Sequence, residues 1–256
     1  MSDLEVAERA ARLAGELLLD RFGAAAEGIA SKSSETDLVS DADRAAEAAV
    51  RELLATERPG DAILGEEGAA SPGTTGRRWV VDPLDGTTNY LYGYPAWSVS
   101  VALEDVGRVI AGVVHDPARG ETFVAERGGG ASLGGRELRV RESGRLETAL
   151  IATGFGYAAE LRAEQVGTLQ RVLPAVRDVR RAGSAALDLA WVAAGRVDGY
   201  YERGLKPWDW AAGSLLVAEA GGAVEALDGE PPGLAAAGPA LLPALVDLVR
   251  GAESAT

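Results

Sequence analysis

The chain has 256 residues, of which 47% are hydrophobic and 25% are charged, the composition of an ordinary globular protein. Its net charge of −14 at pH 7 argues against direct binding to nucleic acid or to an anionic membrane, because proteins bind these anionic ligands through an excess of Lys and Arg. With no cysteine and one histidine, the chain could build a metal site only from oxygen ligands, which favours Mg²⁺, Mn²⁺ or Ca²⁺.

The first predicted element is a helix over about residues 4–22, where apolar side chains recur on one face and Gly23 ends the pattern. This segment is amphipathic and charged, unlike a signal peptide, and the chain has no run of about 18 apolar residues, so we expect a cytoplasmic protein. Ser40, with Asp43 three residues later, predicts the start of a second helix that Pro59 ends.

The next elements are predicted strands. We expect strands in DAILGEE and RRWVVD, residues 61–67 and 77–82, and then an antiparallel meander over 97–140, where β-rich segments alternate with Gly-containing turns. After about residue 146, strands and helices alternate. The pattern therefore predicts an N-terminal α+β half, residues 1–145, and a C-terminal α/β half, residues 146–256.

The segment WVVDPLDGTTNY, residues 79–90, ends a run of apolar strand formers with two aspartates three residues apart. Pro83 cannot continue the ladder of the strand, so a kink there would turn Asp82, Asp85 and the carbonyl of Leu84 toward one point. Three oxygens from four residues suit a hard cation such as Mg²⁺. A simple turn at Asp85 explains the same residues, and on this segment alone both interpretations stay open.

The residues after Asp85 suit a phosphate. Gly86, Thr87 and Thr88 supply backbone N–H groups at the start of a short predicted helix, where anions bind favourably. The aspartyl-phosphate motif of haloacid-dehalogenase-like phosphatases also ends a strand with Asp and Thr, but its aspartates are two residues apart. The spacing here excludes that motif.

The sequence resembles the inositol monophosphatase family of Mg²⁺-dependent, Li⁺-sensitive phosphatases, in particular its bacterial inositol-1-monophosphatase-like members. The resemblance rests on WVVDPLDGTTNY, on GEE from Gly65 and on WDWAAGSLLVAEAGG from Trp208, with less specific matches in SDADRAAE near Ser40 and GSAALDLAWVAAGRVDGYYE from Gly183. It implies a mixed α/β (α+β) fold, a five-layered αβαβα sandwich of the sugar phosphatase type. The N-terminal half would carry most metal ligands, and the C-terminal half would complete the active site and the substrate pocket.

The resemblance also implies an activity, the hydrolysis of inositol monophosphate to inositol and phosphate by a metal-activated water. Two or three Mg²⁺ ions, or Mn²⁺ ions, would serve each site, and a homodimer is expected. The implied ligands are Glu66, Asp82 and the Leu84 carbonyl for the first ion, and Asp82, Asp85 and Asp209 for the second, with Glu66 facing a third. The implied catalytic residues are Asp43 and Thr87, which orient and help deprotonate the water, together with Glu66.

The substrate would be a small phosphate ester. By resemblance, backbone N–H groups of Gly86 and Thr87 would contact its phosphate, and Gly183, Ser184, Ala185 and Glu202 would contact its polyol. The full set of implied substrate-binding residues also includes Asp85, Thr88 and Asp209. A carboxylate at Glu202 can accept hydrogen bonds from neighbouring hydroxyls. Lys206 stands where many animal members carry His and would favour a more anionic substrate, whereas Lys32 is either a phosphate contact or a solvated residue.

Other functions remain open on the sequence. Relatives on this fold hydrolyse histidinol phosphate, which we rank second, fructose 1,6-bisphosphate or 3′-phosphoadenosine 5′-phosphate. Some bacterial members also bind transcription or RNA-processing machinery, so a non-enzymatic interaction protein is the alternative from another class. His115, in a β segment away from every motif, is interpreted as a structural or surface histidine.

Overall fold

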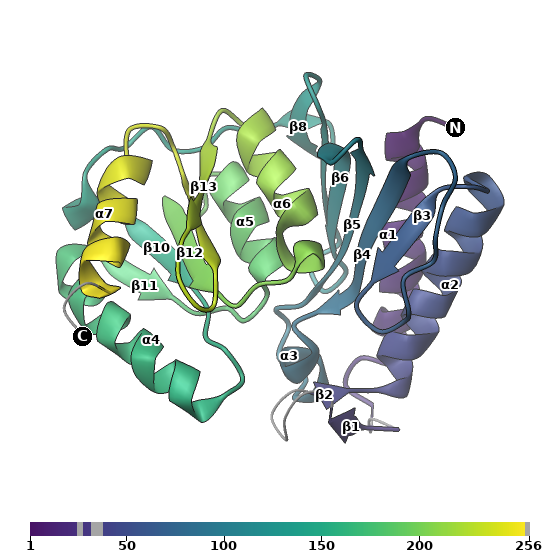
Figure 1. Cartoon of the computed structure of the whole chain (residues 1–256), viewed down its shortest axis with the longest axis horizontal. Coiled ribbons are helices and arrows are strands. Elements are labelled where there is room, and N and C mark those ends of the chain that lie inside the picture. Colours follow the sequence, from purple (N-terminus) through teal and green to yellow (C-terminus); the bar gives the residue numbers. More distant parts are fainter. Residues whose placement is uncertain (25–27, 32–37, 254–256) are drawn as a thin grey trace.

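The computed structural model describes residues 1–24, 28–31 and 38–253. Two sheets and their helices form alternating layers, with the N-terminal half of the chain at one end of the molecule and the C-terminal half at the other (Figure 1). Over the described residues, no helix combines the length and the apolar character that a membrane crossing requires.

The larger sheet has seven strands in the order β3-β4-β5-β6-β7-β8-β9. β3 and β4 are parallel and all later neighbours are antiparallel, which confirms the predicted meander. β8 was not predicted, because the glycines that flank it obscure the strand pattern. The strands span Ala62–Gly65 (β3), Arg77–Asp85 (β4), Ser98–Asp105 (β5), Arg108–Asp116 (β6), Glu121–Glu126 (β7), Gly130–Leu133 (β8) and Arg136–Glu137 (β9).

Two helices, α1 (Asp3–Leu19) and α2 (Asp41–Glu57), cover one face of the larger sheet and pack against each other. The amide of Asp43 donates to Ser40 Oγ, and the carboxylate of Asp43 accepts from the amide of Ser40, a reciprocal cap that starts α2 where the sequence predicted. Helix α1 ends three residues before the predicted limit. The cap matters for the site because it fixes the direction of the Asp43 side chain.

The smaller sheet has five strands in the order β11-β10-β12-β14-β13. β10 is parallel to β11 and β12, whereas β14 is antiparallel to β12 and β13. The strands span Leu150–Thr153 (β10), Asp178–Arg180 (β11), Gly199–Arg203 (β12), Ala223–Leu227 (β13) and Gly233–Ala237 (β14). The three-residue β11 was missed from the sequence because so short a segment shows no alternation.

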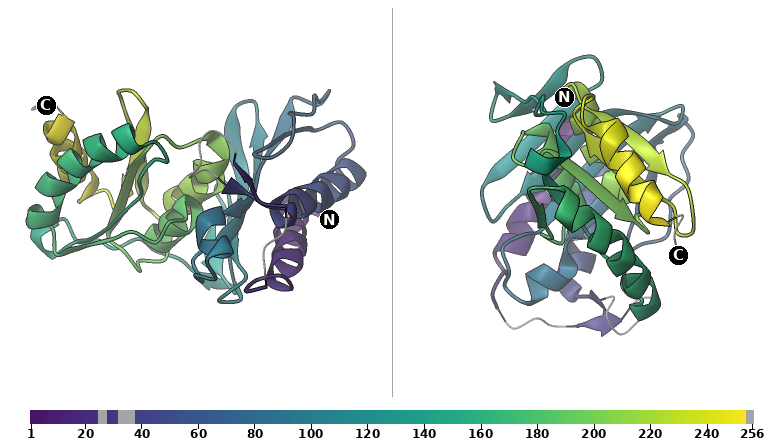
Figure 2. Two further views of the ribbon diagram at one scale, coloured as in Figure 1. Left: turned by 90° about the horizontal axis from the view of Figure 1, so that it is seen from below. Right: turned by 90° about the vertical axis from the view of Figure 1, so that its left-hand side faces the viewer.

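Helices α5 (Ala185–Ala193) and α6 (Pro207–Glu219) lie between the two sheets, and α4 (Ala159–Val172) and α7 (Leu242–Glu253) cover the outer face of the smaller sheet (Figure 2). The order of layers is therefore α-β-α-β-α, which confirms the five-layered sandwich. The remaining short elements are β1 (Ala30–Ser31), its antiparallel partner β2 (Leu38–Val39), α3 (Thr87–Leu91) and the 3-10 turns at Leu146–Thr148 and Leu173–Ala175.

The core between the two sheets joins both halves of the chain. Phe123 from the larger sheet and Tyr200 from the smaller sheet are fully buried in one cluster with Leu187 of α5 and Leu216 of α6. The sheets divide the chain between residues 137 and 150, but they share this core. The division into halves at residue 145 stays a prediction about how the chain is organised.

Strand β4 corrects one expectation. It continues past Pro83 to Asp85, although the proline was expected to end the strand. The pairing of β4 with β5 resumes at Asp85 after a shift in register that follows Asp82. This β-bulge accommodates the missing N–H of the proline and places both aspartates at the end of the same strand.

Candidate active site

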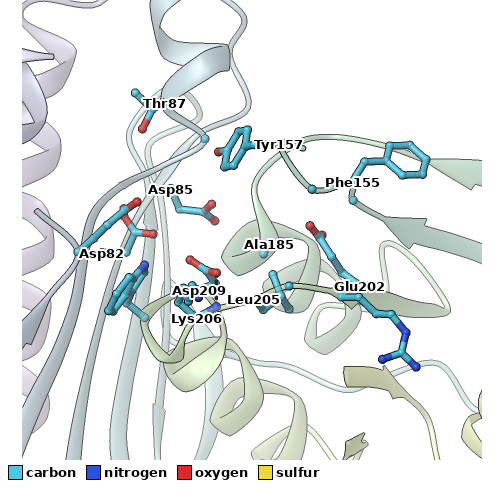
Figure 3. A pocket seen from close by; sticks show the side chains of 18 of the residues that line it. Asp82, Asp85, Thr87, Phe155, Tyr157, Ala185, Glu202, Leu205, Lys206 and Asp209 are labelled. Atoms are coloured by element: carbon cyan, nitrogen blue, oxygen red, sulfur yellow. Dashed lines mark hydrogen bonds between the residues drawn. The ribbon is translucent and has the colours of Figure 1, made fainter. Parts of the chain in front are cut away.

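One pocket lies between the two halves, beyond the carboxyl ends of β4, β10 and β12 and beside the first residues of α3, α5 and α6 (Figure 3). Its volume is about 420 Å³. The predicted site residues that line it are Glu66, Asp82, Leu84, Asp85, Gly86, Thr87, Gly183, Ala185, Glu202 and Asp209. Asp43, Thr88 and Ser184 are not part of the lining.

Backbone and side-chain donors anchor each aspartate of the pocket. The amide of Leu84 donates to Asp82 Oδ1 over 3.0 Å, and the amide of Lys206 donates to Asp209 Oδ2 over 2.7 Å. Asp85 Oδ2 accepts from Ser184 Oγ at 2.6 Å and from the amide of Ala186 at 2.8 Å. Ser184 therefore acts behind Asp85 and not as part of the pocket wall.

The acidic side chains destabilise one another's charged forms. Burial, followed by the charge of Glu66, raises the pKa of Asp82 well above its ordinary value. Burial raises the pKa of Asp85 to about 6, although the hydrogen bond from Ser184 acts in the opposite direction. Burial, followed by the charge of Asp85, also raises the pKa of Asp209. A bound cation would remove this repulsion.

The donor set fits a hard divalent cation in its chemistry. It consists of carboxylates and the carbonyl of Leu84, which are oxygen ligands of the kind that Mg²⁺ and Mn²⁺ prefer. Within residues 1–24, 28–31 and 38–253, however, no three acidic or histidine side chains stand in positions that could hold a metal ion. A bound cation would relieve the repulsion between these carboxylates and order them around it.

Asp43 and Thr87 meet at one edge of the pocket. Thr87 Oγ1 lies 3.0 Å from Asp43 Oδ1 and 3.1 Å from the carbonyl oxygen of Leu84, so its proton is donated to one of the two. The other oxygen of Asp43 accepts from the amide and the hydroxyl of Ser40. Both side chains are buried, and the pair can hold a proton in a fixed place.

Glu202 lies across the pocket from Asp82 and Asp85 (Figure 3). Tyr200 Oη donates to Glu202 Oε2 over 2.7 Å, and burial raises the pKa of Glu202 to about 7. Gly154 leaves room for the carboxylate, since a Cβ there would come 1.9 Å from Oε2. The side of the pocket opposite the aspartates thus carries the carboxyl group of Glu202, which Tyr200 holds in a fixed orientation.

Several pocket residues were missed from the sequence. Phe155, Tyr157 and Leu161 come from the turn after β10 and from the start of α4, and Arg181 precedes α5. These residues belong to no motif. The only available signal was their position after the carboxyl end of a strand in an α/β sheet, where ligands commonly bind.

A buried acid behind this wall was missed as well. Asp188 of α5 is fully buried, and its Oδ1 has no hydrogen-bond partner among the described residues. Burial, followed by the charge of Glu202, raises the pKa of Asp188 well above its ordinary value. No sequence pattern indicates that Asp188 is buried, because an acidic residue in the first turn of a helix is also explained by a favourable interaction with the helix dipole.

Three further residues have clear outcomes. His115 is buried on β6, with Nδ1 2.9 Å from Thr122 Oγ1, so the structural interpretation of this histidine holds. The side chain of Thr88 is exposed outside the pocket. Lys32 lies outside the described residues.

Comparison with known families identifies the chain. The model of the Inositol monophosphatase family matches residues 2–250. The chain belongs to this family. Members of the inositol monophosphatase family are phosphatases and are generally metal-dependent, so the acidic pocket is the expected place for both properties.

Its similarity to individual proteins supports the same assignment. The chain is 48% identical to "Inositol-1-monophosphatase" of Rhizobium meliloti over 221 residues, which cover 86% of this chain and 83% of the relative. It is 44% identical to "Nus factor SuhB" of Escherichia coli K12 over 228 residues, covering 88% of this chain and 85% of that protein. The structure of a Thermotoga maritima IMPase has a TM-score of 0.90 at 32% identity and covers 99% of both chains.

Proposed function

We propose that this inositol monophosphatase family member hydrolyses inositol monophosphate to inositol and phosphate. The observation that carries the proposal is the opposition, across one pocket, of an acidic donor set around Asp82 and the oriented carboxylate of Glu202. The first can hold cations that bind a phosphate, and the second can bind hydroxyl groups. The Rhizobium meliloti relative named inositol-1-monophosphatase supports this substrate.

We assign the metal sites to the carboxylates of the pocket. The assigned ligands are Glu66, Asp82 and the carbonyl of Leu84 for one Mg²⁺ ion, and Asp82, Asp85 and Asp209 for a second, with a third ion near Glu66 and Mn²⁺ as an alternative. When bound, such ions neutralise phosphate charge and lower the pKa of a water molecule. These ligands include the clustered carboxylates, whose charged forms repel one another and therefore cost free energy when no cation is bound.

The residues of the chain itself have separate tasks. Asp43, through Thr87, orients the attacking water and takes its proton, because the two side chains already share one hydrogen bond. Backbone N–H groups of Gly86, Thr87 and Thr88 orient the phosphate, with Thr88 contributing no side chain to the pocket. Ser184 keeps Asp85 in place through its 2.6 Å hydrogen bond.

The polyol would occupy the part of the pocket next to Glu202. The carboxylate accepts hydrogen bonds from two hydroxyls, while Gly183 and Ala185 form the adjacent wall. A ring of hydroxyl groups satisfies an acid that is otherwise costly to bury, whereas a phosphate there would be repelled. This is the physical reason to prefer a polyol monoester.

Phosphate release from four esters, measured with Mg²⁺ and with EDTA, tests the proposal. The panel is inositol 1-phosphate, histidinol phosphate, fructose 1,6-bisphosphate and 3′-phosphoadenosine 5′-phosphate. We expect Mg²⁺-dependent release with a preference for inositol 1-phosphate. A preference for another ester would retain the metal chemistry and overturn the substrate.

Arg181 and Lys206 give specific support to the alternative esters. Both residues line the pocket, and both could bind a second anionic group. Fructose 1,6-bisphosphate and the bisphosphorylated nucleotide carry such a group. Histidinol phosphate instead carries an amine, which Glu202 could bind. The same panel separates these cases.

A non-enzymatic role is the second candidate function. It is favoured by the relatives named Nus factor SuhB, at 43–44% identity. An Asp85→Asn variant discriminates between the two, because it removes one proposed metal ligand and leaves the outer surface unchanged. A cellular phenotype that survives this substitution would favour the interaction role. The homodimer that the family resemblance implies is also a proposal, and sedimentation velocity tests it.

A further inference from the structure

Asn89 is the only asparagine in the 256 residues. It lies on the short helix α3, directly after the threonines of the phosphate segment, and it is partly buried. The proposed function assigns it no role. It lies at the junction between the two halves of the chain.

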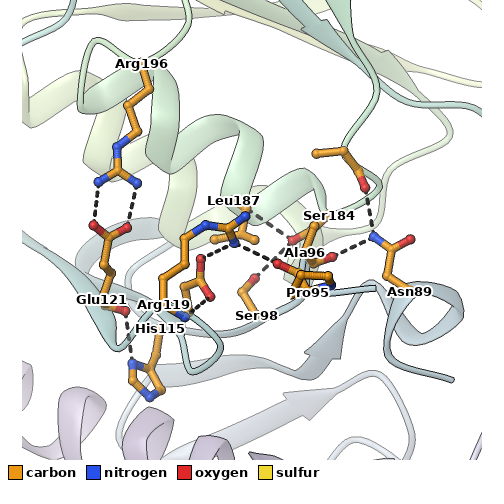
Figure 4. A network of polar contacts seen from close by, with 12 residues as sticks. Asn89, Pro95, Ala96, Ser98, His115, Arg119, Glu121, Ser184, Leu187 and Arg196 are labelled. Carbon is orange, nitrogen blue, oxygen red and sulfur yellow. Dashed lines mark hydrogen bonds and ion pairs between the residues drawn. The ribbon is translucent and has the colours of Figure 1, made fainter. Parts of the chain in front are cut away.

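The side-chain amide of Asn89 links three segments. Nδ2 donates to the carbonyl oxygen of Ala96 over 2.6 Å and to that of Ala182 over 2.8 Å (Figure 4). Ala96 precedes β5 in the N-terminal half, and Ala182 precedes α5 in the C-terminal half. Since both neighbours are carbonyls, a short side chain with two donors is required, which Asn provides and Asp, Ser or Ala does not.

The surrounding backbone leaves little room for a side chain at either of two neighbouring glycines. A Cβ on Gly86 would come 3.0 Å from the carbonyl oxygen of Ala96 and 3.2 Å from that of Gly183. A Cβ on Gly183 would come 2.9 Å from Asn89 Nδ2. Both glycines also have positive φ values, of 96° and 94°, which a side chain would oppose. The backbone segments at Gly86, Ala96 and Gly183 therefore meet around the side-chain amide of Asn89.

The segment that Asn89 holds leads directly to the donors of Asp85. Two residues after Ala182, Ser184 Oγ donates to Asp85 Oδ2, and the amide of Ala186 donates to the same oxygen. Both donors lie at the start of α5, whose position relative to β4 depends on how the preceding turn is fixed. A shift of Ala182 would therefore change the orientation of the Asp85 carboxylate.

We propose that Asn89 is a positioning residue that fixes the start of α5 against α3 and, through Ser184 and Ala186, orients Asp85 for divalent cations. The link between segments stands on the hydrogen bonds alone. Its consequence for cations rests on the proposed function. Groups that orient metal ligands from behind typically change metal affinity by roughly 10–100-fold when removed.

Two measurements on the full chain test this proposal with Asn89→Ala and Asn89→Ser, the second of which retains one donor. Hydrogen exchange of the metal-free protein over residues 182–187 should become faster in both variants, and more so with Ala. Titration calorimetry with Mn²⁺ should show affinity lowered by roughly 10–100-fold in Asn89→Ala and by less in Asn89→Ser. Graded losses of this kind follow the number of donors.

Tyr90→Phe is the matched control, because it removes one buried hydrogen bond, from Tyr90 Oη to the carbonyl oxygen of Leu18, from the same short helix. We expect it to leave both the exchange over residues 182–187 and the Mn²⁺ affinity close to wild type. Unchanged exchange in Asn89→Ala, or Mn²⁺ affinity reduced no more than in Tyr90→Phe, would overturn the proposal. If the wild-type protein binds no Mn²⁺, the metal part of the proposed function fails, and the exchange comparison still decides whether Asn89 holds α5.

Discussion

Thr87 Oγ1 and Asp43 Oδ1 lie 3.0 Å apart although 44 positions separate the two residues in the chain. The capping box of α2 fixes the carboxylate, and the bulged end of β4 delivers the hydroxyl. A buried pair of this kind is suited to proton transfer at one defined point. It is the part of the proposed mechanism that the chain builds without any cation.

The first prediction concerns this pair. Thr87→Val and Asp43→Asn should each lower kcat by roughly 10²–10⁴-fold, the usual contribution of a positioned acid–base group, with a smaller effect on KM. Initial rates of phosphate release from inositol 1-phosphate give both constants. Thr75→Val is the control, because Thr75 Oγ1 forms a similar 2.6 Å hydrogen bond with Asp61 outside the pocket. A wild-type kcat in Thr87→Val would remove the pair from the mechanism.

The second prediction concerns Glu202. Glu202→Gln preserves the size of the side chain but removes its charge and replaces one of the two acceptor oxygens with an NH2 group. KM should therefore rise by about 10-fold or more, with kcat changed less. Steady-state kinetics with inositol 1-phosphate measure this split. Glu225→Gln is the control. Glu225 lies on β13 of the sheet that also carries Glu202, and it forms an exposed ion pair with Arg250 of α7, so the substitution should change neither constant. If KM stays constant in Glu202→Gln, the polyol does not bind at this acid.

The third prediction concerns the cost of the acidic pocket. Asp82→Asn retains an oxygen that can accept from the amide of Leu84 and removes a buried charge that repels its neighbours. The variant should therefore unfold at a higher temperature than wild type in EDTA. Wild type should gain stability with Mg²⁺, by about 2.7 kcal/mol at a concentration 100 times Kd, and the variant should gain much less.

Thermal unfolding of both proteins, with EDTA and with Mg²⁺, measures these differences. Asp178→Asn is the control, since Asp178 is an exposed carboxylate paired with Arg180 and does not line the pocket. It should show the Mg²⁺ effect of wild type. Lower stability of Asp82→Asn in EDTA would mean that the pocket carboxylates do not repel one another in the folded protein.

The fourth prediction uses the single histidine. Burial lowers the pKa of His115 below its ordinary value of 6.5, so the unfolded chain binds a proton more readily than the folded chain. The stability that neutral His115 contributes is complete above about pH 6.5 and is lost as pH falls toward and through the folded pKa. Between pH 7.5 and 5, wild type should therefore lose more stability than His115→Gln.

Urea unfolding at these two pH values gives the difference directly. Pocket acids with raised pKa values, such as Glu202, act with the opposite sign, gaining stability as pH falls. They are present in both proteins and therefore cancel in the comparison. Equal losses in wild type and His115→Gln would show that His115 takes up its proton as easily in the folded state as in the unfolded state.

The residues that could be predicted from the sequence are those whose local context carries the information. Asp82 and Asp85 follow a strand pattern within four residues, and the cap at Ser40 is visible from Asp43 three positions later. The fold followed from motifs spread over most of the chain. Such signals lie in short stretches of sequence and do not depend on tertiary contacts.

The residues that were missed depend on tertiary contacts. Tyr157 and Arg181 line the pocket only because the segments after β10 and before α5 meet the end of β4 there, which no local pattern reveals. Asp188 looks like a solvated acid until α5 is placed between two sheets. Pro83 led to a wrong prediction, the end of β4. A proline does lack the N–H that the ladder of a strand needs, but a bulge in β4 accommodates it and the strand continues.

The central claim is that the acidic pocket of this family member is a metal-dependent phosphomonoesterase site. The most direct test is phosphate release from inositol 1-phosphate by wild type and Asp85→Asn, each with Mg²⁺ and with EDTA. We expect release only by wild type with Mg²⁺, because Asp85 is anchored to face the proposed cations. Equal release by both proteins, or release that persists in EDTA, would contradict the claim.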